Sequence, residues 1–266
     1  MPHGRFAWYQ LATTDTDAAR AFYEGLLSWS SRVVAMPDFS YIVLAAEGSD
    51  MGGVMPLMPE QAQAGVPPHW AGFVEVDDVD ATVKKASELG GAVFAQPADV
   101  PGVGRFAVIA DPQGAMLALF HWIEGLSPPV TPRGTMGAVG WHELAATDWE
   151  AVFPFYAALF GWTKGEPVDM GPMGIYQLFD HDGQSIGGMF NRPPEMPAPF
   201  WLYYAKVPSI DAAIAVIKDC GGKILNGPME VPGGAFIVQA MDPQGAMFAV
   251  VAPPAGATGC GDATAA

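Results

Sequence analysis

The hydrophobic pattern near the N-terminus predicts a strand followed by a helix. Residues 6–12 are mostly apolar, as expected of a strand in a buried sheet. Asp15 comes soon after them, and its side-chain oxygen suits the start of a helix, where it accepts a backbone N–H. The helix is indicated by apolar residues at helical spacing, namely Ala18, Ala19, Phe22, Tyr23 and Leu26.

The same order returns further along the chain. Residues 70–76 predict a second strand, and Asp77-Asp78 precede a helix that Gly90-Gly91 closes. One face of this helix carries Val79, Val83, Ala86 and Leu89. Short strands are expected after each helix, so the pattern is strand, helix and short strands, twice over.

The whole pattern is itself repeated, which indicates a duplication. Residues 10–15 return as residues 143–148, shifted by 133 positions. Gly52-Gly53 returns as Gly187-Gly188 at a shift of 135, and small loop insertions explain why the shift differs along the chain. Later matches share a shift of 131: Pro68-His69-Trp70 with Pro199-Phe200-Trp201, and residues 111–116 with residues 242–247.

We therefore expect two similar domains, residues 1–124 and 138–253. Between them, residues 125–137 contain several prolines that interrupt regular structure, so we place a linker there. Residues 254–266 are small, polar and glycine-rich, and we expect this tail to be disordered. The repeated Asp-Pro-Gln-Gly motifs at Asp111 and Asp242 suit tight turns in hairpins, and we interpret them as structural rather than catalytic.

Composition narrows the function classes. Twelve basic and 28 acidic residues give a net charge of -16, and no basic stripe exists to neutralise phosphates, so nucleic acid is not an expected partner. Neither a secretory signal nor a membrane-spanning apolar run is evident, which predicts a cytoplasmic protein without membrane contact. Cys220 and Cys260 form neither a disulfide framework nor a zinc pattern. Pairing of chains into a homo-oligomer stays open.

These motifs, in this order, resemble the vicinal-oxygen-chelate superfamily, which includes glyoxalase I, bleomycin-resistance proteins and extradiol dioxygenases. The resemblance rests on both copies: the helix carrying Ala-x-x-Phe-Tyr at residues 19–23, Leu-Phe-Gly-Trp at residues 159–162, Val-Asp-Asp-Val-Asp at residues 76–80, and the Asp-Pro-Gln-Gly turns. It implies an α+β fold in which paired βαβββ modules curl into a cup that holds the ligand. Metal-dependent members place four His, Gln or Glu ligands on strands facing the cup.

When these metal-ligand positions are transferred to this chain, none of them holds a side chain that can coordinate a divalent metal. They fall on Trp8, Ala71 and Ala118 in the first copy and on Trp141, Leu202 and Ala249 in the second. The remaining position falls near residues 52–55 and 187–190, which hold only Gly, Val, Met and Phe. A one-residue error in register would recover only His142. We therefore expect no divalent metal and no other cofactor.

If this register is right, strand alternation predicts which side chains line each cup. The expected ligand-binding residues are Trp8, Gln10, Phe73 and Glu75 in the first copy and Trp141, Tyr204 and Lys206 in the second, with Glu143 as the candidate catalytic residue. Such a cup is aromatic with a few polar groups, as small-molecule pockets generally are.

Glu143 admits two interpretations, because a carboxylate in an apolar cup is costly unless it is paired or protonated. It is an acid or base or a partner for a cationic ligand, or else a structural group tied to a backbone amide or to Lys206. The alternative interpretation of Trp8 and Trp141 is that they only fill the space left by a lost metal. His69 and His142 are interpreted as satisfied or surface histidines, and His142 lies on the opposite face from Glu143.

Two functional hypotheses follow. The first is a protein that binds a small aromatic or cationic molecule in an aromatic cup without a divalent metal. The alternative is a lyase, isomerase or dioxygenase-like enzyme that uses Glu143 as acid or base, or a metal whose ligands lie elsewhere. The fold alone does not separate them, since one scaffold hosts many chemistries.

Overall fold

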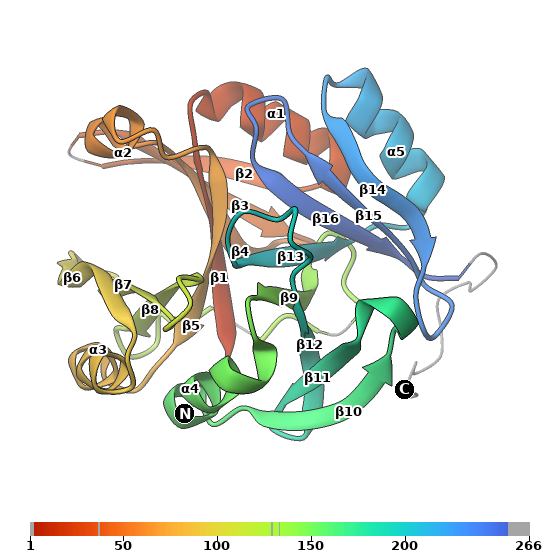
Figure 1. Cartoon of the computed structure of the whole chain (residues 1–266). Helices are drawn as coiled ribbons and strands as arrows, with labels where there is room; N and C mark the ends of the chain where they lie inside the picture. The colour runs from red at the N-terminus through yellow and green to blue at the C-terminus, as the bar shows by residue number, and fades with distance from the viewer. Residues whose placement is uncertain (1–2, 37, 129, 133, 255–266) are drawn as a thin grey trace. The chain divides into compact units, whose positions relative to one another are not determined.

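The computed structural model describes residues 3–36, 38–128, 130–132 and 134–254. It confirms the predicted α+β architecture, with two mixed sheets of eight strands each (Figure 1). The predicted disordered tail, apart from Pro254, and Cys260 lie outside the described residues.

The first repeat contains β1 (Phe6–Thr13), α1 (Thr16–Leu27), β2 (Ser30–Ala35), β3 (Ser40–Ala46), β4 (Ser49–Pro56), α2 (Pro59–Gln63), β5 (His69–Glu75), α3 (Val79–Glu88), β6 (Ala92–Val100), β7 (Gly104–Ala110) and β8 (Met116–Trp122). The second contains β9 (Val139–Ala146), α4 (Trp149–Phe160), β10 (Thr163–Asp169), a short 3-10 helix (Gly171–Met173), β11 (Ile175–His181), β12 (Gln184–Asn191), β13 (Phe200–Lys206), α5 (Ile210–Asp219), β14 (Lys223–Glu230), β15 (Phe236–Met241) and β16 (Met247–Ala252).

The two sheets have the same strand order, which confirms the duplication. The first runs β2-β3-β4-β1-β5-β8-β7-β6, and the second runs β10-β11-β12-β9-β13-β16-β15-β14. Each sheet therefore joins two βαβββ modules through the first strand of each. The parallel pair β5 and β8 alongside the antiparallel hairpin of β7 and β8 makes the sheet mixed.

The predicted helix starts are confirmed by their caps. Asp15 accepts a hydrogen bond from the backbone N–H of Ala18, and Asp78 accepts one from that of Ala81. The apolar faces are buried except at two predicted positions. Ala18 is exposed, and Leu89 is 40% exposed because α3 ends one residue earlier and Leu89 forms its cap.

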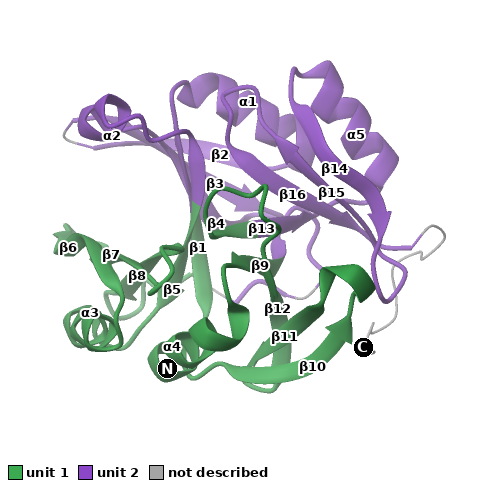
Figure 2. Ribbon diagram, in the orientation of Figure 1, with its two compact units in different colours: residues 1–9, 71–128, 141–202 green, residues 10–70, 129–140, 203–266 purple. Residues whose placement is uncertain are grey.

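The chain divides into two compact units, coloured separately in Figure 2. Unit 1 comprises residues 1–9, 71–128 and 141–202, and unit 2 comprises residues 10–70, 129–140 and 203–266. Each unit combines one module from each repeat: α3 packs on α4 in unit 1, and α1 packs on α5 in unit 2. The predicted domain and linker boundaries remain a prediction, with β8 ending at Trp122 and β9 beginning at Val139.

A buried Trp–Tyr–Asp chain joins the two modules within unit 1. The indole of Trp201 donates to the Tyr156 hydroxyl at 3.2 Å, and that hydroxyl donates to Asp111 at 2.8 Å. The other oxygen of Asp111 accepts the backbone N–H groups of Gln113 and Ala115. The Asp-Pro-Gln-Gly turn is thus the hairpin turn between β7 and β8, as predicted, and it also anchors α4.

Unit 2 contains the equivalent chain. Trp70 donates to Tyr23 at 2.9 Å, and Tyr23 donates to Asp242 at 3.0 Å, in the turn between β15 and β16. Burial raises the pKa values of both Tyr23 and Asp242. The final glycine of this turn, Gly245, has a φ of 103°, which a residue with a side chain rarely adopts.

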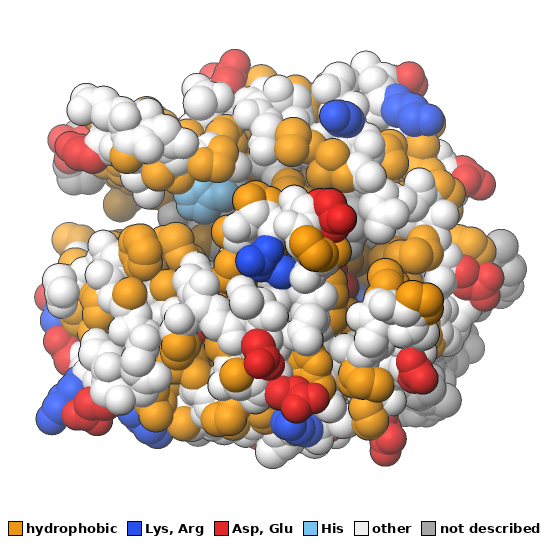
Figure 3. Space-filling model, viewed as in Figure 1, with side chains coloured by type: hydrophobic (Ala, Val, Ile, Leu, Met, Phe, Trp, Pro, Cys, Tyr) orange, Lys and Arg blue, Asp and Glu red, His pale blue; other side chains and the backbone are white. Residues whose placement is uncertain are grey.

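The surface agrees with the charge pattern of the sequence. In Figure 3 acidic and basic side chains are scattered among hydrophobic ones on the visible face rather than gathered in one patch. Within the described ranges, no helix is both long and apolar enough to cross a bilayer.

Candidate functional site

Strand β9 presents two chemically different faces. His142, Leu144 and Ala146 point to one side and are buried, whereas Trp141 and Glu143 point to the other and are partly exposed. On the buried side, a chain of stacked rings from His142 through Phe6 and Trp162 leads to Tyr156 of α4. The side with Trp141 and Glu143 is therefore the face turned away from the helix.

On that face a hydrogen-bond relay links three side chains. The indole nitrogen of Trp141 donates to the hydroxyl of Tyr176 at 2.8 Å, and this hydroxyl donates to Oε2 of Glu143 at 3.1 Å. An indole N–H can only donate, so the tyrosine proton is directed to the carboxylate. Burial, and then the charge of Glu143, raise the pKa of Tyr176 well above its usual value, so Tyr176 stays protonated.

A glycine makes room for this tyrosine. Gly188 of β12 pairs with Glu143 of β9, and a Cβ atom on Gly188 would lie only 2.0 Å from the Tyr176 ring. The Tyr176 ring also stacks with Phe190, with centroids 6.0 Å apart. Trp141 and Glu143 were predicted here, but Tyr176 was missed because it lies on β11, 33 residues after Glu143.

The first repeat contains the same arrangement within unit 2. Tyr41 of β3 donates to Oε1 of Gln10 at 3.3 Å, and its ring lies over Gly53, where a Cβ atom would approach it to 2.3 Å. Tyr41 and Gly53 match Tyr176 and Gly188 at the shift of 135 already found for the glycine pairs. This repeated Tyr and Gly spacing is the signal that would have identified Tyr176.

Within unit 1, the first repeat also forms an aromatic cluster. Trp8 and Ala71 pack against Phe73, Ala118 and Phe120, three buried residues. Trp8, Ala71 and Ala118 are three of the positions onto which the metal-ligand pattern was carried. Their assembly in one cluster supports the strand register that was used to locate them.

Trp122 extends this cluster and was not predicted. Its ring lies 5.8 Å from Trp8, edge to face, and 4.2 Å from Phe120. Its indole nitrogen is buried and has no hydrogen-bond acceptor among the residues that the structure describes. A buried donor without a partner is rare, so this nitrogen is available to an acceptor from elsewhere.

The residues at these positions do not fit a divalent metal. Two alanines and an indole supply no imidazole, carboxylate or amide oxygen. In the second repeat, Glu143 is a single carboxylate beside two aromatic side chains. The described ranges contain no group of three or more His, Cys, Asp or Glu side chains arranged to hold a metal ion.

Unit 2 holds a polar counterpart of the aromatic cluster. Tyr204 of β13 occupies the position that matches Phe73, and its hydroxyl accepts a hydrogen bond from Gln239 at 2.7 Å. Asn226 donates in turn to Gln239 at 3.3 Å. Nearby, the side chain of Lys206 packs over Gly140, where a Cβ atom would lie 2.7 Å from its Cε atom.

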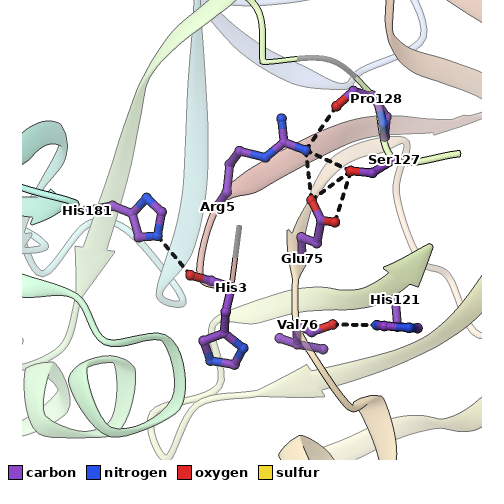
Figure 4. Close-up of polar contacts among 8 residues, drawn as sticks. All are labelled: His3, Arg5, Glu75, Val76, His121, Ser127, Pro128 and His181. Atoms are coloured by element: carbon purple, nitrogen blue, oxygen red, sulfur yellow. Dashed lines mark hydrogen bonds and ion pairs between the residues drawn. The ribbon is translucent and has the colours of Figure 1, made fainter. Parts of the chain in front are cut away.

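Glu75 is engaged in a structural network (Figure 4). Its side chain is buried, and Arg5 donates to it at 2.7 Å. Ser127 donates to both of its carboxylate oxygens, and Arg5 also binds the carbonyl of Pro128. These contacts fasten the chain after β8 to β5. A ligand contact for Glu75 therefore remains a prediction that must compete with this network.

The histidines are satisfied by local partners. His142 bonds to the Tyr9 hydroxyl and to the Ile186 carbonyl, each at 2.6 Å, and burial lowers its pKa to about 4. His69 bonds to the carbonyl of Pro67, and His121 bonds to that of Val76 (Figure 4). These contacts agree with the interpretation that His69 and His142 are structural.

Comparison with known proteins extends these findings. The family model for the Glyoxalase/Bleomycin resistance protein/Dioxygenase superfamily matches residues 5–119 and again residues 138–250. Anthracycline biosynthesis protein DauV of Streptomyces sp. (strain C5) is 32% identical over 96% of this chain and 97% of its own. The putative glyoxylase CFP32 of Mycobacterium tuberculosis is 31% identical over 92% of this chain and 94% of its own.

Solved structures show the same fold. The Mn(II)-bound glyoxalase from Novosphingobium aromaticivorans has a TM-score of 0.65 at 15% identity, over 94% of this chain and 82% of that chain. The 2,2',3-trihydroxybiphenyl 1,2-dioxygenase from Sphingomonas wittichii strain RW1 also has a TM-score of 0.65, at 12% identity, over 94% of this chain and 90% of that chain. At such low identity these similarities concern architecture alone.

Proposed function

The chain belongs to the Glyoxalase/Bleomycin resistance protein/Dioxygenase superfamily, and from this premise we propose that it binds a small aromatic molecule without a divalent metal. The observation that carries the proposal is the Trp141–Tyr176–Glu143 relay. It places an aromatic surface and one fixed carboxylate on the face of β9 that points away from the helix. A flat ring can stack on such a surface while the carboxylate fixes its orientation.

The relay is suited to binding because it is pre-organised. Each side chain is held by a hydrogen bond to the next, and Gly188 leaves the space that the Tyr176 ring fills. Groups already held in the bound conformation lose little conformational entropy when a ligand arrives. The carboxylate also gives a cationic group of the ligand a favourable partner.

The names of two relatives indicate a class of ligand. Anthracycline biosynthesis proteins DauV and DnrV are each 32% identical to this chain. Anthracyclines have a planar polycyclic ring system, and many carry an amino sugar. Such a molecule combines the flat aromatic part and the cationic part expected for this surface, so anthracycline-like compounds are the ligand class that we propose to test first.

The test is a titration of the protein into doxorubicin, an anthracycline whose own fluorescence anisotropy reports binding. Trp141→Ala removes the stacking surface and the first donor of the relay, and we expect affinity to fall about fivefold or more, since one aromatic stacking contact is worth roughly 1–3 kcal/mol. The matched control is Phe94→Ala, which removes an aromatic side chain that is 63% exposed on β6 and should leave affinity unchanged. Unchanged affinity in a folded Trp141→Ala variant would contradict the proposal.

A second candidate is an enzyme in which Glu143 acts as acid or base. It is favoured by the hydrogen bond from Tyr176, which fixes the orientation of the carboxylate. The relative named putative glyoxylase CFP32 suggests the hemithioacetal of methylglyoxal and glutathione as a test substrate. This candidate predicts turnover that is lost in Glu143→Gln, and an absence of turnover by the wild-type protein would count against it.

A further inference from the structure

The two faces of the β7–β8 hairpin in unit 1 are covered to different extents. Strand alternation places Ile109 and Leu119 on one face and Phe106 and Trp122 on the other. Ile109 and Leu119 are fully buried, and α3 packs on both strands. Phe106 and Trp122 remain partly exposed. The face that carries Phe106 and Trp122 is therefore the less covered side of this hairpin.

This less covered face is apolar, although the chain has a net charge of -16. It holds the aromatic cluster described above, to which Phe106 also belongs, and every side chain of that cluster is alanine, valine, phenylalanine or tryptophan. A sheet face left to water usually carries polar side chains, whereas an apolar patch that stays partly exposed is typical of a binding site. Because the cluster contains no charged side chain among the described residues, it suits a neutral ligand.

A glycine makes room for the rings on this face. Gly104 of β7 pairs with Trp122 of β8, and a Cβ atom on Gly104 would lie only 2.4 Å from the Phe120 ring. The rings of Phe120 and Trp122 lie 4.2 Å apart, and Trp122 meets Trp8 edge to face at 5.8 Å. Together the three rings give a flat aromatic molecule a surface on which to pack.

Trp122 also contributes a polar group to this face. Its indole nitrogen is buried and finds no acceptor in the part of the chain that the structure describes. An indole N–H can only donate a hydrogen bond, so the group that complements it is an acceptor. A buried donor without a partner costs free energy, which an acceptor on a ligand would recover.

The donor becomes accessible if the indole of Trp122 rotates. The nitrogen is covered although the side chain as a whole is partly exposed, so a ligand reaches it after a change of the side-chain torsions. Such changes are common where a partner binds. Within the described ranges the N–H makes no hydrogen bond that the rotation would break, so its cost is limited to packing contacts.

We propose that the aromatic cluster of unit 1 binds a neutral, flat aromatic molecule whose carbonyl oxygen accepts a hydrogen bond from the indole N–H of Trp122. Aryl ketones are the class of compound that combines these features. This inference goes beyond the proposed function, because Trp122 and its neighbours in the cluster are not part of the Trp141–Tyr176–Glu143 relay. It makes Trp122 a binding residue that selects ligands carrying an acceptor.

The experiment compares two probes of almost the same shape, 2-acetylnaphthalene and 2-isopropenylnaphthalene, in which a CH2 group replaces the carbonyl oxygen. Binding is followed by the indole N–H signals of 15N-labelled full-length protein, in which the Trp122 signal is assigned by its loss in Trp122→Phe. We expect the ketone to bind about fivefold more tightly than the hydrocarbon, since one neutral hydrogen bond is gained. Only the ketone should move the Trp122 indole proton downfield.

Trp122→Phe separates the role of the N–H from that of the ring. The variant loses the donor but keeps an aromatic ring at this position, so any loss of packing weakens both probes alike. We expect the preference for the ketone to disappear in this variant. The hydrocarbon probe is thus the matched control, and the indole signals of the seven other tryptophans show whether the variant is folded.

Three results would overturn the inference: equal affinity of the wild-type protein for both probes, a ketone that leaves the Trp122 signal in place, or a preference for the ketone that survives Trp122→Phe. The first two need only the wild-type protein, so the test holds even if the variant does not fold. If the ketone fails at Trp122 while doxorubicin binding depends on Trp141, the inference falls and the proposed function stands. The opposite pair of results would leave the inference standing alone.

Discussion

The Trp–Tyr–Asp chains and the faces around Gln10 and Glu143 have diverged to different extents since the duplication. Trp70–Tyr23–Asp242 and Trp201–Tyr156–Asp111 are identical in residue type and in hydrogen-bond pattern. The residues predicted to face the ligand differ between the repeats. Gln10 in the first repeat corresponds to Glu143 in the second, and Phe73 corresponds to Tyr204. The chains fix the packing of each unit, whereas the faces can change without disturbing it, so the difference separates scaffold from candidate site.

The strongest test of this comparison removes the acceptor of a Trp–Tyr–Asp chain. Asp111→Ala removes the acceptor of three hydrogen bonds, two buried ones from Tyr156 and the Ala115 N–H and a partly buried one from the Gln113 N–H, and we expect the free energy of unfolding to fall by about 4 kcal/mol. Asp242→Ala should cost a similar amount, because its contacts are the same. Urea denaturation measures both values.

The matched control for this pair is Glu143→Gln, which alters only the proposed site and should leave the unfolding midpoint nearly unchanged. A single ordinary hydrogen bond contributes about 1 kcal/mol net. If either aspartate variant lowered the free energy of unfolding by less than this, the Trp–Tyr–Asp chains would not be the scaffold.

A somewhat smaller effect on stability is expected from protonation of His142. At this position the duplication brings two unlike residues together. His142 matches Tyr9 at the shift of 133, and the two side chains bond to each other. The pKa of His142 is lowered from 6.5 to about 4, so the unfolded chain takes up a proton at a higher pH than the folded chain. Stability due to neutral His142 is therefore complete above pH 6.5 and is lost as pH falls toward 4.

The lowered pKa of His142 corresponds to a loss of roughly 3 kcal/mol in the free energy of unfolding over this pH range. The measurement is urea unfolding at several pH values, with His142→Asn as the control because its side chain does not titrate in this range. The wild-type curve should fall more steeply than that of the variant between pH 6.5 and 4. Parallel curves would show that His142 is not buried in its neutral form.

The sequence predicted the scaffold well because its signals are local. Asp15 and Asp78 precede their helices directly, and strand alternation placed Trp141 and Glu143 on one face of β9. Trp8 and Ala71, which were located by the register transferred from the family, pack against one cluster.

The partners of these residues could not be predicted, because they come from distant parts of the chain. Tyr176 reaches Glu143 from β11, and Arg5 and Ser127 occupy the carboxylate of Glu75 from outside its strand. Pairings of this kind depend on tertiary structure, and the internal repeat of Tyr41 and Tyr176 was the available signal for them. Trp122 is a different case, because strand alternation places it on the same face of β8 as Ala118, and this signal was present in the sequence.

The most direct test of the central claim is the doxorubicin titration carried out in excess EDTA and again with Mn(II), Zn(II), Ni(II) or Fe(II) added. We predict the same saturable binding in all conditions, because the binding surface that we propose, Trp141, Tyr176 and Glu143, needs no metal ion. Binding that disappears in EDTA and returns with one of the metals would contradict this account and would place metal ligands at positions that we have not identified.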